Sequence, residues 1–280
     1  MSDNRRGHYR GMTDAIGFVG LGSQGGPMAM RILAAGMPLM VWARRPDAAM
    51  PYRAEGAAVA ASLAELGAAC RHIGLCVVDD SDVMEIADQL LPSMAPGAIL
   101  AIHATVLPAT VIALEAQCHA RGLRLIDAPV SGGGVVAARG ELTVMCGGTP
   151  EAFAQALPVL ESFGKLIVLL GGAGAGQQAK ILNNALLSAH LGAAWAVLRA
   201  AQALGIDKAS LVPIIAASSG RSYGFELAAG LSAPQDFALG ADRLRKDMAL
   251  LEAILPDVPE VGLLSQTAAD FLRADRSAPV

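Results

Sequence analysis

A glycine-rich turn near the N-terminus has the residue spacing of a phosphate-binding loop. Gly20, Gly22 and Gly25 fit the pattern GxGxxG, which here follows an apolar stretch and precedes a helical one. In this pattern the first glycine permits a tight turn, the second lets the backbone approach a pyrophosphate, and the third lets helix and strand pack closely. An ordinary glycine-rich turn is the alternative, but the context favours dinucleotide binding by Gly20, Gly22, Ser23, Gln24 and Gly25.

Two arginines stand where a site for NAD usually has an acidic side chain. An Asp or Glu about 20 residues after the glycines, at the end of the second strand, bonds the ribose hydroxyls of NAD. This chain instead has Arg44 and Arg45 after the apolar residues 39–42. A guanidinium pairs bidentately with a phosphate, so Arg44 is predicted to bind the 2′-phosphate of NADP. NADP is therefore the expected cofactor, and NAD is possible in its place. The alternative interpretation of the two arginines is that they are solvated surface residues.

A lysine and an asparagine are four residues apart at the start of a long helical stretch. Lys180 and Asn184 follow the glycine-rich segment 171–176, and residues at this spacing share one helix face. Reduction of a carbonyl needs a hydride on carbon and a proton on oxygen, and a lysine ammonium can give that proton and stabilise the developing alkoxide. Lys180 is the candidate acid/base, although such a pair on a helix face is more often simply solvated.

A second run of glycines follows an expected strand end, where α/β sheets bind ligands. Ser131, Gly132 and Gly133 lie in the segment 127–134, and successive glycine N–H groups with a serine hydroxyl form a nest suited to a carboxylate. Pro129 stands where the nucleophile motif GxSxG has its first glycine. Ser131 is therefore predicted to bind a small carboxylate-bearing substrate and not to attack it.

Short aliphatic stretches alternate with longer helical ones from residue 15 onward, which is typical of a parallel sheet with crossover helices. Strands are expected at 15–19, 39–42, 73–78, 99–103, 123–126, 142–146 and 166–170. Helices are expected at 28–35, 82–91, 108–121 and 151–163, and one long helix at 177–204. The predicted fold class is α/β, with an N-terminal doubly wound Rossmann sheet followed by an all-helical C-terminal domain.

The change of pattern near residues 172–176 divides the chain. We expect a disordered leader at 1–14, an NAD(P)-binding Rossmann domain at 15–173, and an all-helical domain for substrate binding and oligomerisation at 174–280. The long helix is apolar nearly all round, so it must be buried against other helices or a second subunit. A homodimer or homotetramer is therefore expected.

Charge and composition exclude several classes of partner. The 21 basic and 25 acidic residues give a formal net charge of −4 without a long basic block, which argues against nucleic acid. No uncharged apolar span reaches the roughly 18 residues of a membrane helix, and residues 1–14 lack the apolar core of a signal peptide, so a cytoplasmic protein without membrane contact is expected. No histidine spacing suits a metal. His103, at the end of an expected strand, is left between a packing role and a ligand contact.

These pieces, in this order, resemble the β-hydroxyacid dehydrogenase family over about residues 15–255. Four stretches carry the likeness: residues 17–29, residues 127–133 with 140–145, residues 174–184, and Phe237 with Lys246-Asp247. The resemblance implies a Rossmann domain, an all-helical domain, and an active site in the cleft between them. It also implies Lys180 as the catalytic lysine, Asn184 as its substrate-orienting partner, and Ser131, Gly132 and Gly133 around the substrate carboxylate. Further cofactor contacts are implied for Val78, Thr105 and Lys246.

Two departures from the family pattern bear on the substrate. The family often has Asp-x-Ser-Thr before a proline, and here only Thr105 of that group is kept; Val136 stands at a position that is commonly glycine and is expected to narrow or reshape the pocket. The expected function is NADP-preferring interconversion of a small β-hydroxy acid and its semialdehyde or oxo acid. Reduction of an imine or a larger oxo substrate is the alternative, against which the retained Lys180 argues. A nicotinamide-binding module without catalysis is a third hypothesis.

Overall fold

The computed structural model describes residues 14–273 of the chain. The chain divides into two compact units, residues 1–180 and 181–280, so that the division falls within one long helix, directly after Lys180. The sequence predicted a boundary after residue 173, before that helix begins. The predicted leader at 1–14 lies outside the described residues apart from Asp14.

The first unit is built on a sheet whose first six strands are all parallel. Their order is β3-β2-β1-β4-β5-β6, which is the strand order of a Rossmann fold. The order in which the chain adds strands to the sheet reverses between β1 and β4, although the strands themselves stay parallel. The predicted doubly wound sheet is therefore confirmed. The strands are β1 (Ala15–Val19), β2 (Leu39–Trp42), β3 (Ala58–Val59), β4 (Cys70–Leu75), β5 (Ile99–Ile102) and β6 (Arg124–Asp127).

Three further strands extend the sheet: β7 (Val130–Ser131), β8 (Leu142–Gly148) and β9 (Gly164–Gly171). β8 runs antiparallel to β6 and β7, and β9 runs parallel to β8. The sequence pattern did not predict β3 and β7, because each is only two residues long and shows no periodicity. The strand predicted at 73–78 corresponds to β4, which begins earlier, at Cys70. The polar residues Arg71 and His72 interrupt the apolar run by which the strand was recognised.

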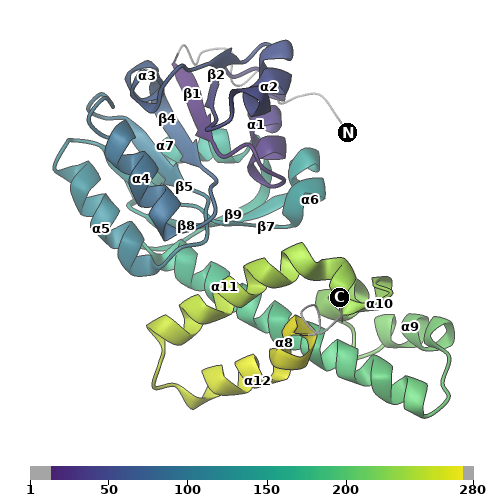
Figure 1. The fold of residues 1–280 in the computed structure, drawn as a ribbon. Helices are drawn as coiled ribbons and strands as arrows, with labels where there is room; N and C mark the ends of the chain where they lie inside the picture. Colours follow the sequence, from purple (N-terminus) through teal and green to yellow (C-terminus); the bar gives the residue numbers. More distant parts are fainter. Residues whose placement is uncertain (1–13, 274–280) are drawn as a thin grey trace. The chain divides into compact units, whose positions relative to one another are not determined.

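Helices cover both faces of this sheet (Figure 1). On one face α1 (Gly25–Ala34), α2 (Met50–Ala54), α6 (Gly133–Arg139) and α7 (Pro150–Leu160) pack onto a core that includes Met28, Ile32 and Phe163. On the other face α3 (Leu63–Ala69), α4 (Asp80–Leu90) and α5 (Pro108–His119) pack onto a core that includes Ile86 and Leu114. A short 3-10 turn, η1 (Pro46–Ala49), precedes α2.

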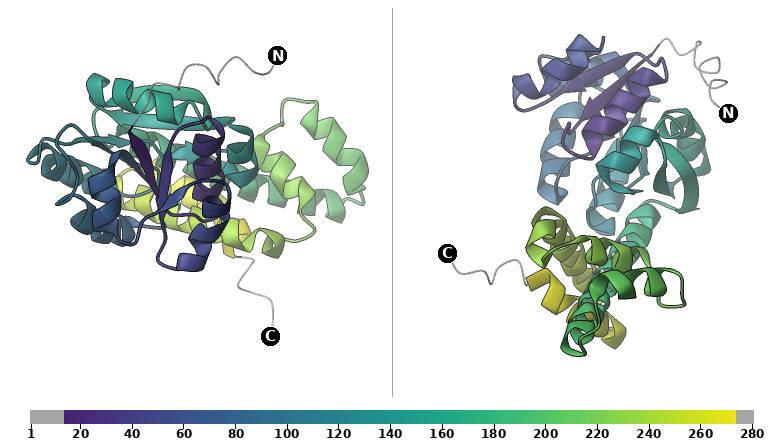
Figure 2. Two further views of the ribbon diagram at one scale, coloured as in Figure 1. Left: turned by 90° about the horizontal axis from the view of Figure 1, so that it is seen from above. Right: turned by 90° about the vertical axis from the view of Figure 1, so that its right-hand side faces the viewer.

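Helices alone make up the described part of the second unit (Figures 1 and 2). The unit contains α8 (Ala175–Ala203) from Ile181 onward. The other helices, which lie wholly within it, are α9 (Lys208–Ala216), α10 (Tyr223–Gly230), η2 (Pro234–Phe237), α11 (Ala238–Ile254) and α12 (Pro259–Arg273). They share a core of their own that includes Ile181, Phe225 and Leu251. A Cβ at Gly192 would lie 1.9 Å from the Thr267 carbonyl oxygen, so the glycine within the long helix permits α8 and α12 to pack closely.

Among the described helices, α8 is long and apolar enough to cross a membrane by length and composition. Half of its most apolar 18-residue window is buried inside the protein. A core helix passes the same test of length and composition, and we interpret α8 as one.

A buried carboxylate joins the end of β6 to the first turn of α8. Asp127 Oδ1 accepts a hydrogen bond from the Gly174 backbone N–H and Oδ2 accepts one from the Gln177 N–H, each at 2.8 Å. Helix N-termini leave such N–H groups without intrahelical partners, and a carboxylate there is favoured by the helix dipole. A Cβ at Gly176 would lie 2.3 Å from the Met145 carbonyl oxygen. The start of α8 is therefore tied to both β6 and β8.

Asp127 makes the stability of this junction depend on pH. Burial raises the pKa of Asp127 to about 6, while the N–H groups of Gly174 and Gln177 oppose that shift. An unfolded aspartate has a pKa of about 3.9, so the folded protein binds this proton more tightly than the unfolded chain does. The contribution is therefore fully present below about pH 4 and is lost as the pH rises through about 6.

We expect the unfolding free energy of the wild type, measured relative to an Asp127→Asn variant that cannot titrate, to fall by about 1 kcal/mol between about pH 5 and about pH 7. Urea denaturation followed by circular dichroism at the two pH values measures this change. A gap between the two proteins that stays constant or widens over this range would contradict the assignment.

Candidate active site

The turn between β1 and α1 has the geometry that phosphate binding requires. Gly20 has φ of +97°, and a Cβ there would lie 2.1 Å from the Cys76 carbonyl oxygen. A Cβ at Gly25 would lie 2.0 Å from the Gly20 carbonyl oxygen, whereas one at Gly22 would meet nothing within 4 Å. Gly20 and Gly25 therefore serve the fold, while Gly22 leaves open space above the turn. The residues present fit the pyrophosphate of a dinucleotide.

The first turn of α1 favours an anion. Gln24 stands at its N-cap, where its side chain caps no backbone N–H of the helix, and the first turn contains no acidic residue. The N–H groups at such a helix start are suited to bind phosphate oxygens. Ser23 and Gln24, which are predicted cofactor contacts, lie in this turn between Gly22 and Gly25.

The other predicted cofactor residues of the first unit follow parallel strands and so lie at the same edge of the sheet. Arg44 follows β2, Val78 follows β4, and Thr105 follows β5. Gln177, in the first turn of α8, holds the loop that carries Thr105: its Oε1 accepts from the Val106 N–H at 3.0 Å and its Nε2 donates to the carbonyl of the residue before Thr105 at 2.9 Å. The glycine turn and these three residues are brought together at the carboxyl edge.

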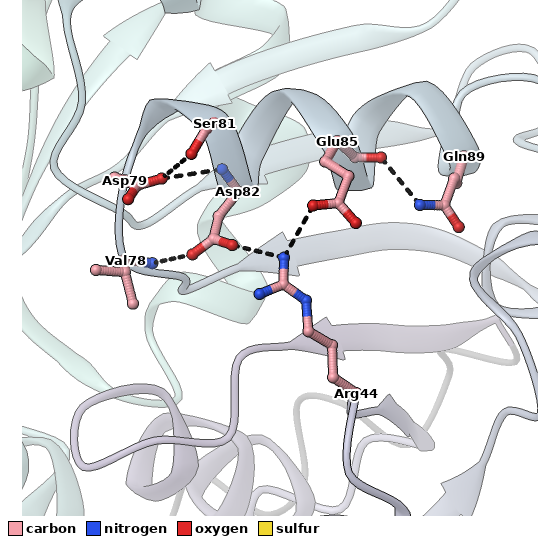
Figure 3. Close-up of polar contacts among 7 residues, drawn as sticks. All are labelled: Arg44, Val78, Asp79, Ser81, Asp82, Glu85 and Gln89. Carbon is pink, nitrogen blue, oxygen red and sulfur yellow. Dashed lines mark hydrogen bonds and ion pairs between the residues drawn. The ribbon is translucent and has the colours of Figure 1, made fainter.

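Arg44 is engaged by two carboxylates of α4 (Figure 3). Its Nη2 lies 2.5 Å from Asp82 Oδ1 and 3.2 Å from Glu85 Oε2. The hydrogen bond to Asp82 and its negative charge raise the pKa of the guanidinium. A phosphate contact and free solvation were the two alternatives for this arginine from the sequence, and the structure shows a third arrangement, an ion pair within the protein.

The predicted carboxylate-binding segment packs beside the glycine turn. Gly132 and Gly133 have φ of +135° and +74°, which few other residues adopt readily. A Cβ at Gly134 would lie 2.2 Å from the Ser23 carbonyl oxygen, so this segment touches the turn directly. Ser131 ends β7 just before it. The nest and the phosphate-binding turn are thus neighbours in the first unit.

Val136 packs beneath this segment. A Cβ at Gly132 would lie 2.7 Å from Val136 Cγ1, and Val136 is partly buried against the core on the α1 and α6 face of the sheet. From the sequence, Val136 is predicted to narrow or reshape the pocket. Val136 lies in contact with both Gly132 and the core, so it bears on the shape of the segment that carries Gly132.

Lys180 lies in the second turn of α8, and only 9% of its surface is exposed. Asn184 follows one turn later on the same helix, in the second unit, with 8% exposed. Asn184 Nδ2 donates to Asp247 Oδ2 at 2.5 Å, and Lys246 Nζ lies 3.4 Å from Asp247 Oδ1. The buried Asp247 therefore brings two predicted site residues, Asn184 and Lys246, together within the second unit.

His103 is a packing residue. It is buried, its Nδ1 donates to the Ala128 carbonyl oxygen at 2.9 Å, and its ring stacks on Phe18 and meets Phe163 edge-on. Burial lowers the pKa of His103 to about 4, so the ring is neutral at physiological pH. No group of three or more potential metal ligands occurs among residues 14–273.

Four residues with a part in this arrangement were not assigned a role from the sequence: Asp82, Asp127, Gln177 and Asp247. Three of them are buried polar side chains, and burial of a charged or amide group requires a partner. Gln177, Lys180 and Asn184 recur at helical spacing, which was a signal for Gln177. No local signal pointed to the partners of the aspartates.

These features define a class of protein, the oxidoreductases that bind a dinucleotide on a Rossmann fold. Residues 15–172 match the family model described as the NAD binding domain of 6-phosphogluconate dehydrogenase. Residues 174–274 match the model described as NAD-binding of NADP-dependent 3-hydroxyisobutyrate dehydrogenase.

Individual relatives belong to the same kind of enzyme as the two family models. The chain is 35% identical to L-threonate dehydrogenase of Cupriavidus necator over 219 residues, which cover 77% of this chain and 74% of that one. The structure of 3-hydroxyisobutyrate dehydrogenase of Mycobacterium tuberculosis with L-serine has a TM-score of 0.84 at 27% identity and 95% coverage of both chains. Psf3 in complex with NADP+ and 2-OPP has a TM-score of 0.82 at 29% identity, covering 92% and 94%. The chain belongs to the β-hydroxyacid dehydrogenase family of NAD(P)-dependent enzymes, as its motifs predicted.

Two glycine variants separate the fold from cofactor binding. Gly22→Ala is expected to change the unfolding free energy by less than about 0.5 kcal/mol, since its Cβ meets nothing within 4 Å. It should weaken NADP or NAD binding more than about tenfold, because the methyl group occupies the space for the pyrophosphate.

The matched variant Gly20→Ala should instead destabilise the fold by about 1–3 kcal/mol, because of the positive φ and the contact with Cys76. Thermal denaturation and calorimetric titration with each dinucleotide measure both effects. Unchanged dinucleotide affinity in Gly22→Ala would exclude this turn as the phosphate site.

Proposed function

We propose that the protein is an NADP-preferring oxidoreductase that interconverts a small β-hydroxy acid and its semialdehyde or oxo acid, with Lys180 as the acid/base. The observation that carries the proposal is the burial of Lys180 one turn after Gln177. Lysine is almost never buried unless it is paired, so the Lys180 ammonium is held in a defined position. Gln177 is hydrogen-bonded to Asp127 and to the loop of Thr105, and thereby joins α8 to the carboxyl edge of the sheet. Lys180 lies about one helical turn after it and is therefore near this edge.

A bound nicotinamide dinucleotide supplies or accepts the hydride in this chemistry. Lys180 Nζ gives a proton to the carbonyl oxygen during reduction and takes it back from the hydroxyl during oxidation. Its positive charge also stabilises the negative charge that develops on that oxygen. The Ser131 hydroxyl and the N–H groups of Gly132 and Gly133 bind the substrate carboxylate. Asn184, held by Asp247, orients the substrate.

Gly20, Gly22, Ser23, Gln24 and Gly25 hold the pyrophosphate in this proposal, with Val78, Thr105 and Lys246 as further cofactor contacts. Arg44 binds the 2′-phosphate, and this role makes NADP the preferred cofactor, with NAD as a weaker substitute. Two findings support NADP: the C-terminal match to a model described as NADP-dependent and the relative solved with NADP+. The absence of an acidic residue directly after β2 supports it as well.

Lys180→Ala is expected to lower turnover by about 10²- to 10⁴-fold while leaving dinucleotide affinity within about threefold of the wild type. Lys165→Ala is the matched control, because Lys165 is an exposed lysine of the same unit, in β9. Its turnover should equal that of the wild type. Wild-type turnover in Lys180→Ala would end the proposed role of this lysine.

The substrate class is tested with a panel of small semialdehydes, oxo acids and one cyclic imine, each with NADPH and NADH, followed by nicotinamide absorbance. Oxidation of NADPH by a semialdehyde or oxo acid is the expected result. Oxidation by the imine alone would instead identify an imine reductase. No oxidation by any compound would indicate a binding module without catalysis.

We also propose that the protein is a cytoplasmic homodimer or homotetramer. Leu182, Leu186 and Val197 of α8 are exposed in the single chain, and helical periodicity places them within about 60° of one another around the helix. An exposed apolar stripe on an otherwise packed helix is favourable when another subunit covers it. Sedimentation equilibrium should give a dimer or tetramer mass, and a monomer at micromolar concentration would contradict this proposal.

A further inference from the structure

The acidic partners of Arg44 occupy the atom that a phosphate would need. Asp82 and Glu85 both contact Nη2 of the guanidinium (Figure 3). Nη2 carries two N–H donors and belongs to both two-donor edges of the group, the one shared with Nε and the one shared with Nη1. Either bidentate grip on a phosphate therefore requires at least one of the two carboxylates to give way.

Asp82 is the stronger of the two partners. Its side chain is 17% exposed and lies 2.5 Å from Nη2, whereas Glu85 is 63% exposed and lies at 3.2 Å. Asp82 Oδ2 also accepts from the Val78 N–H at 3.3 Å, and the Asp82 N–H donates to the N-cap residue Asp79 at 3.0 Å. The carboxylate is thus held in place by the first turn of α4, next to a predicted cofactor residue.

The ion pair between Arg44 and Asp82 affects the binding of NADP and of NAD differently. The 2′-phosphate of NADP must compete with Asp82 and Glu85 for Arg44, and it also brings a second negative group close to them. NAD has a hydroxyl at that position, so it leaves the ion pair intact and avoids this repulsion. A phosphate carries more charge than a carboxylate, so the competition weakens the binding of NADP without abolishing it.

We propose that Asp82 is a specificity-determining residue, which holds Arg44 and thereby reduces the preference of the enzyme for NADP over NAD. Glu85 acts in the same direction with a smaller effect. The inference rests on the proposed contact between Arg44 and the 2′-phosphate. The cofactor preference is therefore set by the ion pair and cannot be read from the arginine alone.

The experiment measures dissociation constants for NADP+ and NAD+ by calorimetric titration without substrate, for the wild type, four single variants and one double variant. Asp82→Asn keeps an oxygen that can accept from Val78 but removes the charge. It should bind NADP+ about three to ten times more tightly, with NAD+ affinity within about twofold of the wild type. Glu85→Gln should give a smaller gain for NADP+. It also tests the proposal at an exposed position should Asp82→Asn fail to fold.

Asp88→Asn is the control for net charge, since it removes one acidic group from α4 about 9 Å further along the helix axis. It should leave both dissociation constants unchanged. Arg44→Ala should weaken NADP+ binding, and adding Asp82→Asn to it should restore little, because Asp82 acts through Arg44. An unchanged ratio of the two constants in both Asp82→Asn and Glu85→Gln would overturn the inference. An equal gain for NADP+ with and without Arg44 would overturn it too.

The same data separate this inference from the proposed function. A wild type that binds NAD+ more tightly than NADP+ contradicts the proposed preference, whereas the role of Asp82 is judged from the change in the ratio on substitution. Unchanged NADP+ affinity in Arg44→Ala would remove the phosphate contact on which both depend. A loss in Arg44→Ala with no gain in the two α4 variants overturns the role of Asp82 alone.

Discussion

The contact on which the arrangement of the first unit depends is the one between the Asp127 carboxylate and the start of α8. Both oxygens of Asp127 are bonded to backbone N–H groups of this turn. The side chain of Gln177, in the same turn, reaches the loop after β5. The ends of two neighbouring strands and the start of the lysine-bearing helix are therefore fixed to one another by hydrogen bonds inside the protein.

Steric exclusion shapes the rest of the carboxyl edge. Gly20 and Gly25 let α1 approach β4 so closely that no side chain fits, and Gly134 does the same between α6 and the turn at Ser23. Gly22 has space around it. Gly20, Gly25 and Gly134 are thus demanded by the packing, whereas Gly22 lies where a ligand can approach. A GxGxxG pattern by itself does not distinguish them.

Charge at this edge depends on partners as much as on residue types. Arg44 follows β2, where an arginine favours a phosphate, yet it is paired with carboxylates that come from α4. In the second unit, Asp247 similarly joins Asn184 to Lys246. In both places a side chain from a distant stretch of the chain bonds a motif residue and limits its position.

The amino-acid sequence alone determined the features that arise from local order. The glycine spacing, the alternation of strands and helices and the four-residue spacing of Lys180 and Asn184 each act within a few residues of chain, and the doubly wound sheet and the family followed from them. Tertiary structure decided the rest. The short strands β3 and β7 exist only because a neighbouring strand pairs with them. Arg44 lies 38 residues from Asp82 and Asn184 lies 63 from Asp247. Such pairs form only when the fold brings distant segments together, so no local pattern records them.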